Sequence, residues 1–330
     1  VVEMSWKVGM VPAMESAFSG LVPADEADQS AMTRFESSLG LTRAHVSTAG
    51  LAVYVHGEDE WADVVDECQP AIPDSDESYI IRWSVDGDGN QVVHVVAASP
   101  AGRRMAWKTI YQVPGNLAGS ELFIADAPAS KWRGVVETFY GPVYEEEDRL
   151  ALLPWLADMK FNQYIYAGKM DLYTDWIGTY WPEEWPAEYV AMLGRMVDAA
   201  KAEGMTPGVQ LRIDSGSVVF SSPDDMAKFL EKVRLFAEVG FELFSLSFDD
   251  TQKVLHGADI DAYESYDLAI IDFSKRAFEA IHAEMPDLIL GWVSTDYWSG
   301  AETASTTLPI AGEQIPPYVS IGWTGREVIP

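Results

Sequence analysis

The chain has 330 residues, of which 48% are hydrophobic, so it can bury the core of one large domain or of two smaller ones. Its 52 acidic residues outnumber its 22 Lys and Arg residues and give a formal net charge of -30. This balance argues against a nucleic acid or an anionic membrane surface as the partner, because both are bound through Lys and Arg. No apolar run reaches the roughly 18 residues of a membrane span. The single cysteine, Cys68, excludes an internal disulfide and leaves the cellular compartment open.

Residues 1–130 are predicted to form a small α/β domain. Segments rich in Val, Ile and aromatic residues predict three strands, and a fourth segment predicts a helix. The strands are expected at 51–57, 78–85 and 91–98, and the helix at 101–113. The sequence DGDGN at 86–90 resembles the start of a calcium loop, but it lacks the later Gly and Glu of that loop. A hairpin turn between the second and third strands is the favoured reading.

Residues 131–330 alternate between apolar strand-like segments and amphipathic helical segments. The strands are expected at 134–139, 163–167, 206–213, 241–248, 288–295 and 318–325. The helices are expected at 145–159, 187–204, 222–240 and 261–285. Such alternation is typical of a parallel sheet covered by helices. No G-x-G-x-x-G motif follows the first strand, which weighs against a dinucleotide-binding fold.

Polar side chains cluster directly after these strands, which favours a (β/α)8 TIM-type barrel, because barrel enzymes carry their chemistry at the carboxyl ends of the strands. The cluster consists of Glu137, Lys169, Asp171, Asp249, Asp250, Asp296 and Tyr297. A complete barrel has eight units in about 250 residues, whereas six strands fall between Trp132 and Pro330. We therefore expect an incomplete barrel, whose two further units lie outside the printed sequence or come from another chain.

The adjacent acids Asp249 and Asp250 follow the apolar strand at 241–248. Two close carboxylates titrate as a coupled pair, so one can remain protonated while the other is ionised. That arrangement suits glycoside hydrolysis, which needs a proton donor beside a negative charge. A carboxylate pair also suits a divalent metal ion, and aspartates after a strand can simply cap the next turn. The spacing alone leaves these three readings open.

Five segments in chain order resemble glycoside hydrolase family 84, which comprises O-GlcNAcases and bacterial β-N-acetylglucosaminidases. The segments are RGVVETFYGPVY at 133–144, FNQYIYAGKMDLY at 161–173, FSLSFDD at 244–250, STDYW at 294–298 and IGWTG at 321–325. The resemblance implies a retaining β-N-acetylglucosaminidase that releases terminal GlcNAc from glycans or glycoproteins. It also favours a secreted or cell-surface bacterial protein over a cytoplasmic one.

The resemblance implies a substrate-assisted mechanism, in which the 2-acetamido oxygen of the substrate attacks the anomeric carbon and forms an oxazoline. Asp249 would then orient the acetamido N–H and stabilise its developing positive charge. Asp250 would protonate the leaving oxygen and later deprotonate water. Because the nucleophile arrives with the substrate, no metal or other cofactor is expected. None of the five histidines lies at a strand end beside the acids, although His256 is close in sequence, which argues against metal-dependent hydrolysis.

The resemblance also implies substrate-binding roles for individual residues of this chain. Lys169 would hydrogen-bond the sugar, Tyr297 would lie near the acetamido group and the scissile oxygen, and Thr324 would lie at the edge of the sugar. On purely structural grounds Lys169 could be a solvated loop cation, Tyr297 a core ring and Thr324 a turn residue. Thr138 stands where the family has a glycine whose backbone approaches the sugar, so its side chain is expected to narrow the pocket.

Two further departures from the family pattern support an alternative function. Met170 replaces an acidic residue after the second strand. The Asn and Asp that the family places after its seventh strand have no counterpart in the printed sequence. The alternative is a catalytically impaired carbohydrate-binding protein built on the same barrel. The oligomeric state cannot be inferred from the sequence.

Overall fold

The structure is a computed structural model. It describes residues 30, 51–56, 74–85, 87, 91–97, 99–112, 121–137, 142, 144–167, 181–214, 216–300 and 304–325. The chain divides into two compact units. One comprises Val1–Arg133, Pro154–Asn162 and Ala202–Gly204, and the other Gly134–Leu153, Gln163–Lys201 and Met205–Pro330. The domain limits 1–130 and 131–330 stay a prediction. Within the described ranges, no helix combines the length and the apolar character needed to cross a membrane.

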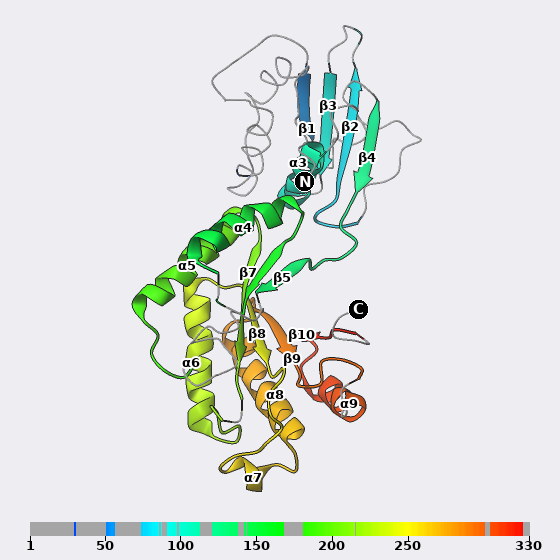
Figure 1. The fold of residues 1–330 in the computed structure, drawn as a ribbon. Coiled ribbons are helices and arrows are strands. Elements are labelled where there is room, and N and C mark those ends of the chain that lie inside the picture. Colours follow the sequence, from blue (N-terminus) through cyan, green and yellow to red (C-terminus); the bar gives the residue numbers. More distant parts are fainter. Residues whose placement is uncertain are drawn as a thin grey trace. The chain divides into compact units, whose positions relative to one another are not determined.

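The first unit contains a four-stranded sheet of order β1-β3-β2-β4 (Figure 1). Its elements are β1 (Leu51–His56), β2 (Tyr79–Val85), β3 (Gln91–Ala97), α3 (Pro100–Gln112) and β4 (Leu122–Asp126). β1 runs parallel to β3, whereas β2 runs antiparallel to both β3 and β4. β2 and β3 pair antiparallel with Val85 opposite Gln91, as a hairpin requires, and the predicted turn at 86–90 lies mostly outside the described residues. β4 is a strand that the sequence patterns did not indicate.

The second unit is a six-stranded parallel sheet of order β10-β9-β8-β7-β6-β5. Its strands are β5 (Gly134–Glu137), β6 (Gln163–Tyr166), β7 (Thr206–Arg212), β8 (Leu243–Ser247), β9 (Ile289–Val293) and β10 (Val319–Gly322). The spatial order follows the chain order, so each strand is added beside the previous one. The sheet is a curled half-barrel with helices, and it confirms the prediction of an incomplete (β/α)8 barrel.

Helices follow the barrel strands along the chain (Figure 1). They are α4 (Glu146–Asp158), α5 (Ala187–Ala202), α6 (Pro223–Val239), α7 (Asp259–Ala262), α8 (Tyr266–Glu284) and α9 (Ala304–Gln314). α6 has the predicted ends: the Ser222 side chain accepts a hydrogen bond from the backbone N–H of Asp225, and Gly240 closes the helix at φ 105. A glycine tolerates this left-handed conformation without the clash that a Cβ atom would cause.

Two helical predictions differ from the structure. The single helix expected at 261–285 is split into α7 and α8, because Ser265 adopts an extended backbone and its side chain caps α8 at Leu268. α9 was not predicted, and it contains Pro309 within its span. Pro309 and Gly312 are poor helix formers, so they weaken the helical signal of this segment in the sequence. Contact with α8 nevertheless stabilises the helix.

The two faces of the barrel sheet differ in polarity, because successive strand residues point to opposite faces. On the outer face Phe244 of β8 packs against Phe229 and Phe236 of α6. On the inner face Ser245 lies against Gly291 of β9, where a Cβ atom would approach the Ser245 Oγ to 3.2 Å. Phe244 therefore supports the helices, whereas Ser245 and Ser247 present small polar groups to the barrel interior.

Candidate active site

The acid pair lies at the carboxyl end of β8, on the side of the sheet where barrel enzymes carry their chemistry. Asp249 continues the inner row of β8 that contains Ser245 and Ser247. The Ser247 hydroxyl donates a short hydrogen bond to Asp249 Oδ1. Arg212, the last residue of β7, donates from Nε to the Asp249 carbonyl oxygen at 2.6 Å and lies 3.8 Å from Asp249 Oδ1. Two neighbouring strands thus hold Asp249 in place.

Asp250 leaves the strand geometry. Its φ of 54 is one of only two positive values among the described non-glycine residues. This left-handed turn breaks the alternation of the strand, so Asp250 is exposed at the sheet end rather than directed toward the helices. The Tyr297 hydroxyl donates a hydrogen bond of 3.0 Å to Asp250 Oδ1. The structure therefore brings together two of the residues that the sequence placed after different strands.

Tyr297 follows β9, and its loop is tied to the loop after β10. The backbone N–H of Thr324 donates to the Tyr297 carbonyl oxygen at 2.9 Å, and the Thr324 hydroxyl donates to the same oxygen at 3.2 Å. Gly325 accepts hydrogen bonds from both the backbone N–H and the hydroxyl of Ser299, at 2.9 and 3.1 Å. Thr324 thus lies behind Tyr297 and fixes the backbone that carries the phenol.

A second set of contacts joins the loops after β8 and β9. Lys253 Nζ lies 2.8 Å from Asp296 Oδ2 and 3.1 Å from Asp267 Oδ1. Burial opposes the charge of Lys253, but its hydrogen bonds to the two carboxylates outweigh burial and raise its pKa. The hydroxyls of Thr251 and Thr295 lie 3.2 Å apart. Asp296, one of the predicted strand-end acids, is therefore a loop anchor directly before Tyr297.

Comparison with known proteins assigns this site to a family. The family model described as beta-N-acetylglucosaminidase matches residues 133–330, which is more than half of the chain. The chain belongs to this family. The match confirms the resemblance to glycoside hydrolase family 84 that the five ordered segments indicated.

Two curated relatives carry the name protein O-GlcNAcase. The protein of Rattus norvegicus is 26% identical over 206 residues, which are 59% of this chain and 21% of the relative. The protein of Mus musculus is 24% identical over 251 residues, which are 73% of this chain and 25% of the relative. The chain therefore spans about a fifth to a quarter of the length of these relatives.

Two solved structures share the fold. A mutant O-GlcNAc hydrolase of Thermobaculum terrenum has a TM-score of 0.54 at 26% identity, covering 60% of this chain and 42% of that chain. The structure of CpGH84B has a TM-score of 0.68 at 20% identity, covering 93% of this chain and 53% of that chain. At 20% identity, the similarity to CpGH84B shows a shared fold and nothing more.

Two site positions predicted from the family pattern, Lys169 and Thr138, lie outside the described residues, as do Met170 and Asp171. Their roles stay predictions. The Asp249 and Asp250 carboxylates accept hydrogen bonds from the Ser247 and Tyr297 hydroxyls, and neither caps a helix, because the next helix begins only at Asp259. Capping of the turn directly after β8 stays an alternative. Among the residues that the structure describes, no group of three or more His, Cys, Asp or Glu side chains could hold a metal ion.

The expectation that Glu137 belongs to this polar cluster is wrong. Glu137 ends β5, but its carboxylate forms a two-pronged ion pair with Arg149 of α4, at 2.8 and 2.9 Å, and accepts a hydrogen bond from the Tyr164 hydroxyl. Only 1% of the Glu137 side chain and 2% of the Arg149 side chain are exposed. Burial opposes the charge of Arg149, but Glu137 outweighs it and raises the pKa of the guanidinium. Glu137 therefore links the sheet to α4 and does not face the site.

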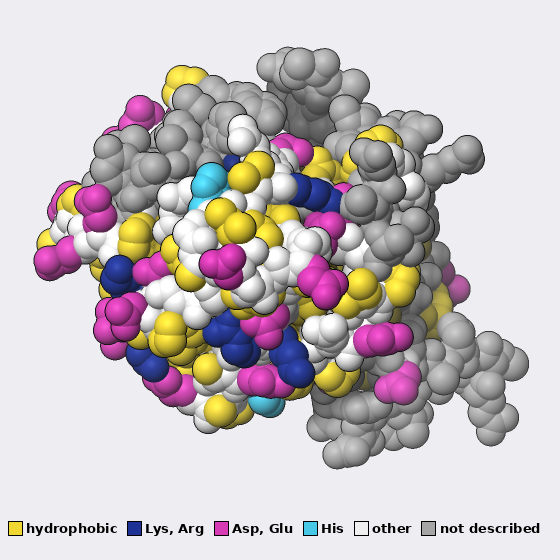
Figure 2. All heavy atoms as spheres, turned by 90° about the horizontal axis from the view of Figure 1, so that it is seen from below, with side chains coloured by type: hydrophobic (Ala, Val, Ile, Leu, Met, Phe, Trp, Pro, Cys, Tyr) yellow, Lys and Arg dark blue, Asp and Glu magenta, His cyan; other side chains and the backbone are white. Residues whose placement is uncertain are grey.

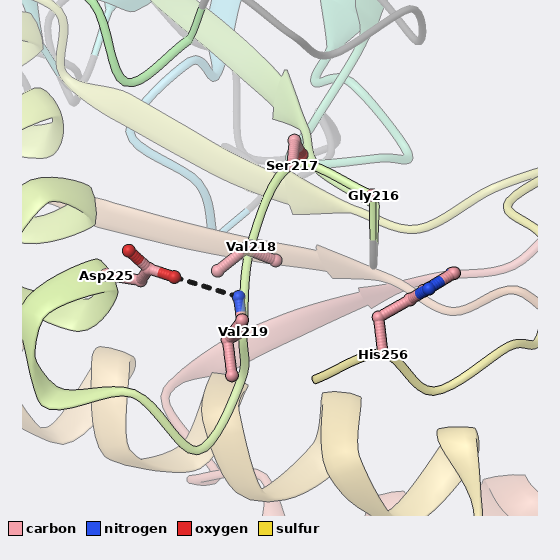
Figure 3. Close-up of a pocket in the computed structure, with 6 residues that line it drawn as sticks. All are labelled: Gly216, Ser217, Val218, Val219, Asp225 and His256. Carbon is pink, nitrogen blue, oxygen red and sulfur yellow. Dashed lines mark hydrogen bonds between the residues drawn. The ribbon is translucent and has the colours of Figure 1, made fainter. Parts of the chain in front are cut away.

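A pocket of about 340 Å³ lies among the loops that follow β7 and β8. Its lining consists of Gly216, Ser217, Val218, Val219, Asp225 and His256. Figure 3 shows Asp225 and His256 on opposite sides of the Val219 backbone. Figure 2 looks onto the end of the molecule that carries α7, where acidic, basic and apolar side chains are interspersed.

Three carboxylates hold the loop that forms this pocket. The Asp214 carboxylate accepts hydrogen bonds from the backbone N–H groups of residues 216 and 217. The Asp225 carboxylate accepts a hydrogen bond from the backbone N–H of Val219. Asp259, which is fully buried, accepts the N–H groups of residues 220 and 221, both at 2.7 Å. These donors are therefore occupied within the protein and are not available to bind an anion.

Proposed function

We propose that this chain carries the acid pair of a retaining β-N-acetylglucosaminidase, which releases terminal GlcNAc by substrate-assisted catalysis. The observation that supports the proposal is the placement of Asp249 and Asp250 at the end of β8, each held by a residue at the end of a neighbouring strand or in the loop that follows it. Arg212 holds the first and Tyr297 the second. Family membership makes a β-linked GlcNAc the substrate that this pair would receive.

In the first step the carbonyl oxygen of the 2-acetamido group attacks the anomeric carbon. The glycosidic bond breaks, and the leaving oxygen takes the proton of the Asp250 carboxyl. The acetamido N–H hydrogen-bonds to the Asp249 carboxylate, which stabilises the positive charge that develops on the oxazoline ring. The protein then needs only a charge partner and a proton donor, because the nucleophile is already positioned within the substrate.

In the second step a water molecule attacks the same carbon from the face that the leaving group has vacated. The Asp250 carboxylate takes a proton from this water, and the oxazoline ring opens to restore the acetamido group. The product retains the β configuration, because two displacements occur at one carbon. The exposed position of Asp250 gives water access to the carboxylate.

The other predicted residues have supporting roles in this scheme. Tyr297 donates to Asp250 and would hold that carboxyl beside the scissile oxygen. The Thr324 hydroxyl is bonded to the Tyr297 carbonyl oxygen, so we assign it first to positioning Tyr297 and second to the edge of the sugar. Lys169 would bind the sugar hydroxyls, and Thr138 would line the pocket. The substrate is expected to be a GlcNAc-bearing glycoprotein or glycan, in line with the names of the relatives.

The experiment is hydrolysis of 4-methylumbelliferyl β-GlcNAc by the full-length protein and by Asp249→Asn and Asp250→Asn variants. Each substitution is expected to lower the rate by about 100- to 10,000-fold, the range that positioned acid–base groups contribute. Proton NMR of the first product formed should show the β anomer. Asp261→Asn, a change of an exposed acid on α7, serves as the matched control and should keep the parental rate.

An inactive parent protein, or parental rates in both variants, would refute the assignment of the catalytic pair. Calorimetry then distinguishes the alternative function. Binding of GlcNAc without hydrolysis, and no tighter binding of a thiazoline that mimics the oxazoline, would indicate a carbohydrate-binding protein. Tight thiazoline binding that is lost in Asp249→Asn would support the enzyme.

A further inference from the structure

Arg212 occupies a place that is unusual for a charged side chain. It is the last residue of β7, and only 7% of its side chain is exposed. In register it lies beside Ser247, the last residue of β8, and both belong to the inner row of the sheet. A buried guanidinium at this position needs acceptors, because an uncompensated buried charge is strongly destabilising.

Arg212 has one strong acceptor in the acid pair. Its Nε donates to the carbonyl oxygen of Asp249 at 2.6 Å, and the same nitrogen lies 3.8 Å from Asp249 Oδ1. The first contact fixes the backbone where the chain leaves β8. The second places positive charge beside the carboxylate, 18% of which is exposed. One side chain therefore fixes both the position and the electrostatic surroundings of Asp249.

We propose that Arg212 is a positioning residue that holds Asp249 against the acetamido group of the substrate. The inference rests on the proposed function, in which Asp249 accepts the acetamido N–H. A displacement of about 1 Å between reacting groups is enough to slow a reaction about 100-fold. The backbone at residues 249 and 250 turns sharply at this point, so the carbonyl anchor limits where the Asp249 side chain can go.

Arginine suits this task better than lysine. Its guanidinium is planar and presents donors in fixed directions, so it can bond a carbonyl and remain beside a carboxylate at the same time. A lysine ammonium sits on a flexible stem with rotatable donors, so it could bond the carbonyl oxygen but would not fix the direction of that bond or the place of its charge beside the carboxylate. Arg212→Lys is therefore expected to recover part of the effect of the wild-type residue and not all of it.

The test uses the full-length protein and two aryl β-GlcNAc substrates, one with 2,4-dinitrophenol and one with 4-methylumbelliferone as the leaving group. Arg212→Leu is expected to lower kcat about 10- to 100-fold on both substrates by the same factor, the range that corresponds to loss of a charge-assisted hydrogen bond. Dinitrophenol leaves without protonation, so a loss that is equal on both substrates points to the acetamido step. In kcat/KM, which reports the steps up to cleavage of the glycosidic bond, Asp250→Asn should instead affect chiefly the umbelliferyl substrate.

A double-mutant cycle separates positioning from general destabilisation. Arg212→Leu should lower the rate less than about threefold in a protein that already carries Asp249→Asn, because the residue it positions is gone. Arg212→Lys should fall between the parent and Arg212→Leu. If Arg212→Leu does not fold, Arg212→Lys and Arg212→Gln take its place. An equal loss of rate on the two substrates in these variants would again point to the acetamido step.

The control is Arg276→Leu, since Arg276 also donates to a backbone carbonyl, that of Phe220, at 2.7 Å but touches neither acid. It should lower the unfolding midpoint and leave kcat per folded molecule unchanged. Equal effects of Arg212→Leu in the presence and absence of Asp249 would overturn the inference. The inference would also be overturned if the Arg212→Leu variant kept the parental rate while the Asp249→Asn variant was slow. That result would leave the proposed function intact. An inactive parent would instead contradict the proposed function.

Discussion

Lys232 of α6 is a buried cation whose stability contribution can be measured. Only 7% of the residue is exposed. Its Nζ donates to the Glu183 carbonyl oxygen at 2.9 Å and lies 4.1 Å from the centre of the Trp185 ring. Burial lowers the pKa of Lys232 from 10.5 to about 8, and the charge of Glu184 opposes that shift only in part.

The magnitude and the sign follow from proton linkage. A tenfold change in proton affinity is worth about 1.4 kcal/mol, so a pKa of about 8 in the folded protein corresponds to about 3 kcal/mol. Between pH 8 and 10.5 the unfolded chain binds the lysine proton and the folded chain has lost it. The free energy of unfolding must therefore rise with pH across this window.

The perturbation is Lys232→Met, which keeps the length of the side chain and removes the titrating group. We expect the stability of the parent relative to this variant to increase by about 3 kcal/mol between pH 7 and pH 10.5. Urea unfolding at half-unit pH steps measures this difference, in which the titration of all other groups cancels. A difference that stays flat within about 0.5 kcal/mol would refute the reasoning, since Trp185 and Glu183 would then compensate the burial in full.

Three other predictions concern the site and its support. Tyr297→Phe should lower kcat on the umbelliferyl substrate about 10-fold while changing the unfolding free energy by less than about 0.5 kcal/mol, because its hydrogen bond to Asp250 is exposed. Thr324→Val should lower the same rate less than Tyr297→Phe does, and Thr324→Ser should restore it, since the hydroxyl acts on the Tyr297 backbone. Glu137→Gln should lower the unfolding free energy by about 3–5 kcal/mol in urea titration, because it leaves Arg149 charged and buried, and activity per folded molecule should not change.

Much of the barrel unit could be predicted from local sequence signals. Apolar runs gave the six strands, because a parallel sheet is buried on both faces. The helix limits were also close, since the range expected at 222–240 contains α6 and its two capping residues, Ser222 and Gly240. The acid pair could be found because two carboxylates directly follow an apolar strand. The resemblance to the family then supplied the expected role of each acid. These signals all lie within a few residues of one another.

The features that were missed depend on contacts between strands. Glu137 is the last residue of β5, whereas Asp249 lies just beyond β8. Because successive strand residues point to opposite faces of the sheet, a shift of one position decides that Glu137 points to the helices and Asp249 to the inner face. The Arg212–Asp249 contact depends on the register between β7 and β8, which no single segment encodes. α9 was missed for a different reason, since Pro309 and Gly312 hide its helical character.

The left-handed turn at Asp250 has a consequence for any attempt to improve this protein. A non-glycine residue in that region carries a strain of about 1–2 kcal/mol, which a glycine would relieve. A screen that rewards thermal tolerance alone would therefore tend to discard the carboxylate that we assign as the proton donor. Position 250 should be held fixed in such a screen, and stabilising changes should be sought elsewhere, where folding and chemistry do not compete.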